Sequence, residues 1–290
     1  MFKNYFVTVM LVVFFASQAG AAEDGGPAEF KRGILLAAFG TSMSEAERGI
    51  SNLVEETRRA FPNVEVRLAY TSNIIRRKLK RERGVDLPSP PEVLARMKDE
   101  GFTHIYVQPM HVIPGEEYDD LKNVVEAFAS VKGKYGFEHV ALGRPFLSES
   151  SDCDLMAGIL SRRFADLPSG KAVVLMGHGS PHKANAMYGE MQKALSRLKG
   201  RFFLGTVEAA PNLEDVLAAL KKTRSKAVVL SPFMVVAGDH ARNDLAGDEP
   251  DSWLSLLKKS GYKVEADLVG LGEYPEVAAL FVNRVREMIE

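Results

Sequence analysis

Three residues with the chemistry of metal ligands each follow an apolar run in the second half of the sequence. His178 comes just after a run that ends at Met176, and it stands between two glycines. Glu208 follows the run 202–207, and His240 follows a third run that ends shortly before it. Parallel α/β sheets bind ligands at the carboxyl ends of their strands, so we expect these side chains to meet at one edge. Two imidazoles and a carboxylate form a natural ligand set for Co²⁺, Fe²⁺, Ni²⁺ or Zn²⁺.

Little in the sequence supports other kinds of reactive site. Cys153 is the single cysteine, which excludes an intrachain disulfide, a four-cysteine zinc site and an iron–sulfur cluster held by the chain's own cysteines. The stretch 177–180, Gly-His-Gly-Ser, could suggest a backbone nest for phosphate, but it lacks the spacing of a P-loop or a dinucleotide site. No Gly-x-Ser-x-Gly motif occurs, and we interpret Cys153 as an incidental helix residue.

The composition is that of a globular protein. The chain has 290 residues, of which 46% are hydrophobic and 26% are charged. It carries 37 Lys and Arg against 38 Asp and Glu, which gives a formal net charge of −1. This balance argues against a general nucleic-acid binder, since such proteins normally show a basic excess.

Strand-like apolar runs and amphipathic helical stretches alternate from Lys31 onward. We therefore predict an α/β fold of two similar halves, each a parallel sheet flanked by helices, with a cleft between them. The N-terminal half spans 29–167, and the C-terminal half, which carries the metal site, spans 168–290. The predicted strands cover 33–39, 64–70, 104–110, 139–145, 172–176, 201–207, 227–235 and 262–269. The predicted helices cover 44–61, a stretch through 83, 91–100, 116–131, 150–164, 183–198, 213–222, 244–259 and 274–289.

The two halves align as an internal repeat. The segment 34–42 lies over 173–180, so that Phe39 corresponds to His178. Further along, 116–117 (Glu-Glu) lies over 239–240 (Asp-His). A repeat of this length indicates duplication of a whole half. Because matching positions carry different residues, we expect one site shared across the cleft instead of two equal sites.

The N-terminus has the layout of a secretory signal peptide. Lys3 precedes the apolar run 6–15, and Ala-Gly-Ala at 19–21 fits a cleavage site. We therefore assign residues 1–21 to a signal peptide and expect a periplasmic protein. An uncleaved anchor or a buried first helix is the alternative. The run is short for a stable membrane span, which needs about 20 residues.

Several long motifs, in order along the mature chain, resemble the anaerobic sirohydrochlorin cobaltochelatases of the CbiK type. They are the segments 33–42, 70–79, 108–118, 176–180 and 231–244. The resemblance implies a class II chelatase fold with two Rossmann-like halves, and insertion of Co²⁺ into a modified tetrapyrrole without ATP. It also implies that His178 and His240 are the metal-binding and catalytic pair, with Glu208 as a third ligand. Members of this family that act in cobalamin synthesis are generally cytoplasmic, so a signal peptide is a departure.

Metal insertion must remove two pyrrole N–H protons, and imidazole can both hold a metal and accept a proton. We therefore expect His178 and His240 to bind Co²⁺, one of them also acting as general base, while Glu208 offsets the metal charge. Glu117, which matches His240 in the repeat, is expected to assist proton removal from the opposite side. Its alternative role is that of a carboxylate stabilised at a helix N-terminus.

The expected substrate, sirohydrochlorin, is rich in carboxylates, so the basic run 76–83 could guide it electrostatically. Most of that run is expected to be a solvated helix face, with Arg76 as the exception. The predicted substrate-binding residues are Thr41, Ser42, Ser72, Arg76 and Ser180, although the hydroxyl groups could instead cap helices.

Two other functions remain open on sequence grounds. The first is insertion of Fe²⁺ to make sirohaem or haem, because ligand type does not separate Fe²⁺ from Co²⁺. The second is a non-enzymatic exported carrier of metal, haem or a tetrapyrrole, which the signal peptide motivates. His104, His111, His139 and His182 lie outside the proposed ligand set. One of them could ligate a bound haem at a surface or in a homo-oligomer, but we expect structural roles for them.

Overall fold

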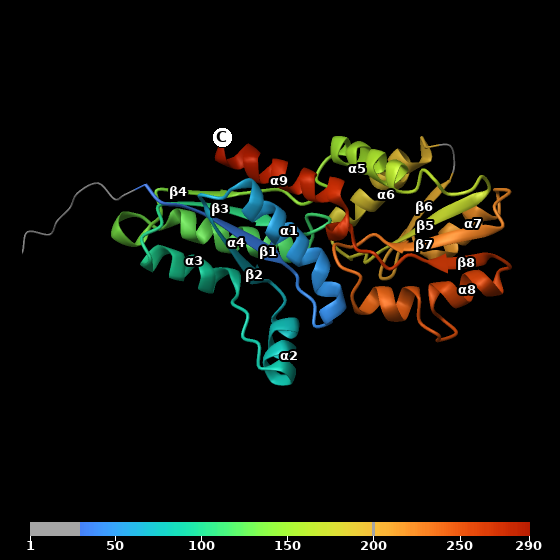
Figure 1. Ribbon diagram of the computed structural model, residues 1–290, viewed down its shortest axis with the longest axis horizontal. Helices are drawn as coiled ribbons and strands as arrows, with labels where there is room; N and C mark the ends of the chain where they lie inside the picture. The colour runs from blue at the N-terminus through green and yellow to red at the C-terminus, as the bar shows by residue number, and fades with distance from the viewer. Residues whose placement is uncertain (1–29, 199–200) are drawn as a thin grey trace, which may run out of the picture.

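The computed structural model describes residues 30–198 and 201–290, and these form two parallel sheets of four strands each (Figure 1). One sheet has the order β2-β1-β3-β4, and the other has the order β6-β5-β7-β8. The predicted α/β fold with two similar halves is therefore confirmed. The proposed signal peptide, residues 1–21, lies outside the described residues. The strands are β1 (Arg32–Ala38), β2 (Glu65–Tyr70), β3 (His104–Pro109), β4 (His139–Leu142), β5 (Lys171–Gly177), β6 (Phe202–Thr206), β7 (Ala227–Pro232) and β8 (Lys263–Ala266).

The inner strands are continuous apolar runs because helices cover both faces of each sheet. In β1 every residue after Arg32 is buried, and in β5 every residue after Lys171 is buried. This pattern is typical of parallel sheets. The covering helices are α1 (Glu47–Ala60), α2 (Asn73–Arg83), α3 (Pro90–Asp99), α4 (Glu116–Ser130), α5 (Ser150–Arg163), α6 (Ala186–Ser196), α7 (Leu213–Leu220), α8 (Trp253–Lys259) and α9 (Pro275–Ile289). None of the helices in the described ranges is long and apolar enough to cross a bilayer.

The predicted start of the helix at 244–259 is wrong, whereas its end at Lys259 is confirmed. The chain instead makes a π-helical turn at Ala241–Leu245, and α8 begins only at Trp253. Gly247 and Pro250 lie between these two elements, and both residues disfavour a continuous helix. Ser252 then caps α8 by accepting a hydrogen bond from the Ser255 amide (3.2 Å).

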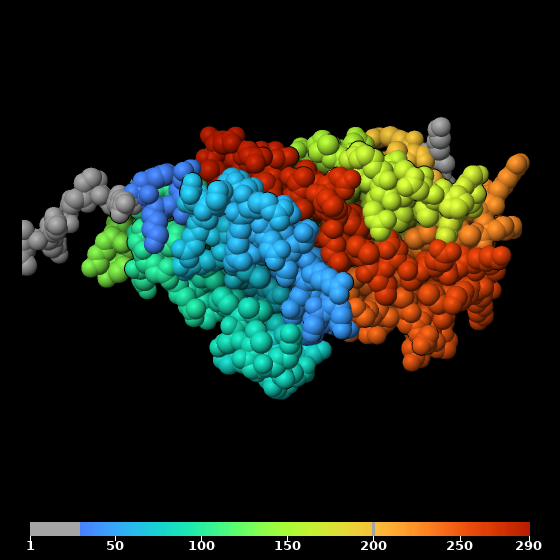
Figure 2. All heavy atoms as spheres, in the orientation of Figure 1, coloured from blue at the N-terminus to red at the C-terminus, as the bar shows by residue number. Residues whose placement is uncertain are grey.

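The last helix of each half packs against the other half. Helix α5 follows β4 but lies against α6, whereas α9 follows β8 but lies against α1 and β3 (Figure 1). In the space-filling view, α9 (red) spans the boundary between the two halves (Figure 2). The sequence division at 167–168 therefore separates the two sheets but not the helices that cover them.

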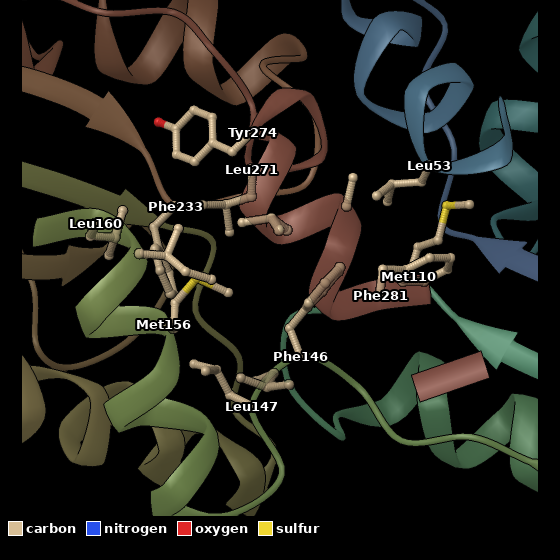
Figure 3. Packing of buried hydrophobic residues seen from close by; sticks show 14 of the residues in the cluster. Leu53, Met110, Phe146, Leu147, Met156, Leu160, Phe233, Leu271, Tyr274 and Phe281 are labelled. Carbon is tan, nitrogen blue, oxygen red and sulfur yellow. The ribbon is translucent and has the colours of Figure 1, made fainter. Parts of the chain in front are cut away.

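This exchange produces one hydrophobic core that is continuous between the halves (Figure 3). Leu53 and Met110 come from the N-terminal half, Phe233 comes from the C-terminal half, and Phe281 of α9 packs with Phe146 at a ring-centroid distance of 5.8 Å. A buried ion pair also crosses the boundary. Arg284 of α9 donates to Asp152 of α5 (2.9 Å), and both side chains are almost fully buried. The shared core and the ion pair thus hold the two halves together.

Candidate metal site

The three predicted ligands converge in the structure. One potential ligand atom from each of His178, Glu208 and His240 lies within 4.8 Å of the others. The two imidazole rings are perpendicular, with their centroids 4.7 Å apart, and Glu208 Oε2 lies 3.8 Å from His178 Nδ1. The side chains are 45%, 48% and 38% exposed for His178, Glu208 and His240, so a metal and a large substrate can both reach them. Such a set could hold a borderline divalent cation.

Neighbouring strands of one sheet place these ligands. His178 directly follows β5, and Glu208 lies two residues beyond the end of β6. The Glu208 amide donates to the His178 carbonyl (2.9 Å), which fixes the two loops beside each other. Gly179 has a φ of +85°, and a Cβ there would lie 2.7 Å from Thr206 Oγ1. Glycine is therefore required at 179 by both backbone conformation and space.

The Nδ1 atom of each imidazole is already in a hydrogen bond. His178 Nδ1 lies 2.8 Å from the Gly179 carbonyl oxygen, and His240 Nδ1 is hydrogen-bonded to Asp244 Oδ2. A carbonyl oxygen and an ionised carboxylate can only accept, so Nδ1 is the donor in both contacts. The proton on Nδ1 leaves Nε2 of each ring with the lone pair that a metal requires.

Thr41 and Ser42 follow β1, and Thr41 lies beside the loop that carries His240. Thr41 is only 4% exposed, and its Oγ1 accepts from the Met43 amide (3.2 Å). The same oxygen lies 3.5 Å from where a Cβ on Gly238 would be. Nearby, α1 approaches so closely that a Cβ on Gly49 would lie 2.4 Å from the Val235 carbonyl oxygen. The first loop of the N-terminal half therefore touches the β7 loop of the C-terminal half.

The other predicted substrate-binding residues make bonds within the protein. Ser72 caps α2 by accepting from the Ile75 amide (3.4 Å), and Ser180 Oγ accepts from the His182 amide (3.1 Å). Arg76 donates to the Leu87 carbonyl (2.8 Å) and to Glu92 (2.7 Å). Binding of substrate by these residues stays a prediction. The basic run as a whole lies on α2, which projects from the N-terminal half, and most of its charged side chains are exposed (Figures 1 and 2).

Glu117 lies in the first turn of α4, beyond β3, and is partly exposed. It is not a member of the three-residue ligand cluster, so its predicted role in proton removal stays a prediction. Cys153 is buried in α5, and burial raises the pKa of its thiol to about 11. A thiol with so high a pKa is a poor nucleophile and a poor metal ligand, in accord with the role expected for it.

A contact between the halves that the sequence did not predict joins His182 to Asp119. His182 Nδ1 accepts from the Ala184 amide (3.2 Å), which places its proton on Nε2, and Nε2 lies 3.3 Å from Asp119 Oδ2 of α4. A cavity of about 490 Å³ opens beside this pair. Two cationic side chains line it, Lys122 from α4 and Lys183 from the loop after β5. Neither lysine belongs to a recognisable motif, and the cavity forms only when the halves meet.

Two four-stranded parallel sheets, with a His, Glu and His cluster beyond the carboxyl ends of strands in the second sheet, define a protein with the chelatase type of fold. In solved structures, the fold is similar to SirB from Bacillus subtilis with Fe³⁺ (TM-score 0.59, 16% identity, 89% of this chain and 95% of that one). It is also similar to CbiX, the terminal enzyme for biosynthesis of siroheme in denitrifying bacteria (TM-score 0.57, 16% identity, 89% of this chain and 100% of that one). At these identities the likeness concerns the fold alone.

The sequence comparisons define the family. The model of the cobalt chelatase (CbiK) family matches residues 32–290, and the chain belongs to this family. It is 38% identical over 259 residues to the sirohydrochlorin cobaltochelatase CbiKC of Nitratidesulfovibrio vulgaris, covering 88% of this chain and 89% of that protein. It is 30% identical over 260 residues to the sirohydrochlorin cobaltochelatase of Salmonella typhimurium, covering 89% of this chain and 97% of that protein.

Proposed function

We propose that this protein is a sirohydrochlorin cobaltochelatase, which inserts Co²⁺ into sirohydrochlorin without ATP and releases two protons. The observation that carries the proposal is the convergence of His178, Glu208 and His240 within 4.8 Å at the open edge of the second sheet. Membership of the CbiK family and the names of the two relatives support the choice of metal and ring.

The chemistry of the site fits this reaction. His178 and His240 hold the incoming metal through Nε2, and Glu208 contributes negative charge that offsets the charge of the ion. Imidazole groups are also suitable acceptors for the pyrrole protons that the metal displaces, because they exchange protons readily near neutral pH. Glu117 acts as a second acceptor from the side of the N-terminal half. Each ligand has a substantial exposed fraction, so the metal can be passed on to the ring.

The carboxylates of the ring need cationic partners in the cleft. Lys122 and Lys183 line the cavity beside the Asp119–His182 pair, and His182 is only four residues from His178. We place ring carboxylates in this cavity, where ammonium groups make charge-assisted hydrogen bonds. We keep Ser42, which follows β1 and is partly exposed, as a further contact for the ring, with the buried Thr41 supporting it beside Gly238.

We also propose that residues 1–21 direct export and that the mature protein works in the periplasm, on the basis of Lys3, the apolar run 6–15 and the small residues at 19–21. The same feature keeps the carrier function as a second candidate, because a pathway that makes tetrapyrroles is expected inside the cell.

The test is a metal-insertion assay on the mature protein with Co²⁺, Fe²⁺, Ni²⁺ and Zn²⁺, each offered with sirohydrochlorin and with protoporphyrin. Preferred insertion of Co²⁺ into sirohydrochlorin is expected. Preferred insertion of Fe²⁺ would support a ferrochelatase. A purified protein that shows a stable Soret band and inserts no metal would support the carrier and overturn the proposed enzyme.

A further inference from the structure

A carboxylate outside the ligand cluster holds the ring of His240. Asp244 Oδ2 is hydrogen-bonded to His240 Nδ1, and Asp244 is not one of the three residues whose ligand atoms converge. The bond fixes the proton on Nδ1 and therefore the lone pair on Nε2, since an ionised carboxylate has no proton to donate. Asp244 thus occupies Nδ1 of His240 and leaves Nε2 as the nitrogen with a free lone pair.

The local backbone keeps the two side chains together. The π-helical turn Ala241–Leu245 follows His240 directly, and the side chains of Ala241 and Leu245 are buried. The Asn243 side chain donates to Asp239 (3.0 Å), and the Gly247 amide donates to the Asn243 carbonyl (3.0 Å). These contacts anchor the turn, so Asp244 and His240 are held at a separation that suits a direct bond. Single π-helical turns of this kind are common at functional sites.

His178 offers a natural comparison. Its Nδ1 is bound by the backbone carbonyl of Gly179, which no side-chain substitution removes (2.8 Å). The two imidazoles therefore present the same nitrogen through different partners. Glu208 also lies 3.8 Å from His178 Nδ1, but it is a candidate ligand, whereas the carboxylate partner of His240 can be changed without altering a candidate ligand.

We propose that Asp244 is a positioning residue that sets the tautomer and the orientation of His240 for metal binding. The inference rests on the proposed function, because it assigns Asp244 a part in delivery of Co²⁺. A carboxylate behind a ligating imidazole fixes the ring and makes it a better ligand, and loss of such a partner typically costs about 10- to 100-fold in metal affinity or activity.

The kinetic test uses Asp244→Ala and Asp244→Asn, with Asp248→Ala as the matched control from the same segment, where the side chain is exposed. At saturating sirohydrochlorin, Asp244→Ala raises the KM for Co²⁺ by about 10- to 100-fold. The KM for sirohydrochlorin stays within about twofold, because Asp244 does not line the cavity that contains Lys122 and Lys183. The KM of Asp244→Asn for Co²⁺ lies between those of wild type and Asp244→Ala, since the amide oxygen still accepts a hydrogen bond. Asp248→Ala behaves as wild type.

The spectroscopic test reports the tautomer directly. In metal-free wild-type protein labelled with ¹⁵N histidine, the neutral His240 ring carries its proton on Nδ1. In Asp244→Ala the proton is no longer held on Nδ1, and both tautomers are populated. The His240→Ala spectrum identifies which signal belongs to His240. Titration of Co²⁺ into the same proteins gives the change in Kd. If wild type inserts no Co²⁺, the proposed function fails while the tautomer and the Kd still decide the role of Asp244. A wild-type tautomer together with a wild-type Kd in Asp244→Ala would overturn the inference.

Discussion

The imidazole rings of His178 and His240 stand perpendicular to each other at a centroid distance of 4.7 Å. His178 directly follows β5, and His240 lies in the loop beyond β7, which pairs with β5 in the same sheet. Perpendicular rings this close can direct a nitrogen from each toward one point without stacking. Glu208, from the strand on the other side of β5, completes the set. All three residues of the cluster therefore come from one sheet, although the loop that carries His240 also packs against Thr41 and Gly49 of the N-terminal half.

Removal of either imidazole is expected to abolish metal insertion. His178→Ala and His240→Ala should each lower the rate of Co²⁺ insertion by at least about 100-fold, because each removes a ligand and a candidate proton acceptor. The rate is followed by the change in the visible spectrum of sirohydrochlorin. His139→Ala is the control, since His139 is exposed and lies on the edge strand β4. Full activity in both site variants, with folding verified by circular dichroism, would refute the assignment.

The cavity lined by Lys122 and Lys183 leads to a prediction about the affinity for sirohydrochlorin. The double substitution Lys122→Ala with Lys183→Ala should raise the KM for sirohydrochlorin about tenfold, because two charge-assisted bonds to ring carboxylates are lost. The rate at saturating ring and the KM for Co²⁺ should change little. Lys221→Ala with Lys222→Ala removes equal charge from the surface at the end of α7 and serves as the control. Equal rises in KM in both double variants would indicate a general charge effect in place of a specific cavity.

The cluster of candidate ligands was predictable from sequence because each residue follows a strand of the same parallel sheet, and the carboxyl ends of such strands share one edge. His178 and Glu208 lie within two residues of their strands, whereas His240 lies eight residues beyond β7 and is also placed by the loop. The contact between Asp119 and His182 was not predictable, since it joins two halves whose relative placement depends on the continuous core around Phe146 and Phe281. The exchange of α5 and α9 between the sheets was not predictable either, because no local pattern in these helices indicates which half each one packs against.

Arg76 illustrates a different limit of prediction from sequence. Its sequence position, just beyond the end of β2, matched that of a substrate-binding residue, but its guanidinium bridges Leu87, Glu92 and Asn73 (2.8, 2.7 and 3.1 Å). Arg76→Ala should therefore lower the free energy of unfolding by about 1–2 kcal/mol. Arg77→Ala, on the exposed face of the same helix, should change it by less than about 0.5 kcal/mol. Urea denaturation measures both. A tenfold rise in KM for sirohydrochlorin with unchanged stability would instead support substrate binding by Arg76.

The buried pair of Asp152 and Arg284 should contribute strongly to stability. Asp152→Ala leaves the Arg284 guanidinium buried without its carboxylate, and loss of one partner of a buried pair typically costs about 3–5 kcal/mol. Asp154→Ala, two residues further along α5, breaks an exposed pair with Arg197 and should cost less than about 1 kcal/mol. Guanidinium unfolding monitored by circular dichroism gives both values. Equal effects of the two substitutions would contradict the importance of the bridge between α5 and α9.

His111 should make the folded state sensitive to acid. Both ring nitrogens are buried without a hydrogen-bond partner among the described residues, and burial lowers the pKa of this imidazole to about 4. An unfolded histidine has a pKa near 6.5, so between about pH 6.5 and about pH 4 the unfolded chain binds a proton that the folded chain does not. This contribution to stability is therefore complete above about pH 6.5 and is lost as the pH falls toward about 4, with a slope of up to about 1.4 kcal/mol per pH unit.

His111→Phe should remove that part of the slope, whatever its effect on stability at neutral pH. Urea unfolding at about pH 7.5 and about pH 5 measures the slope, with His139→Phe as the exposed control. Parallel losses of stability in wild type and His111→Phe would show that other groups cause the acid sensitivity.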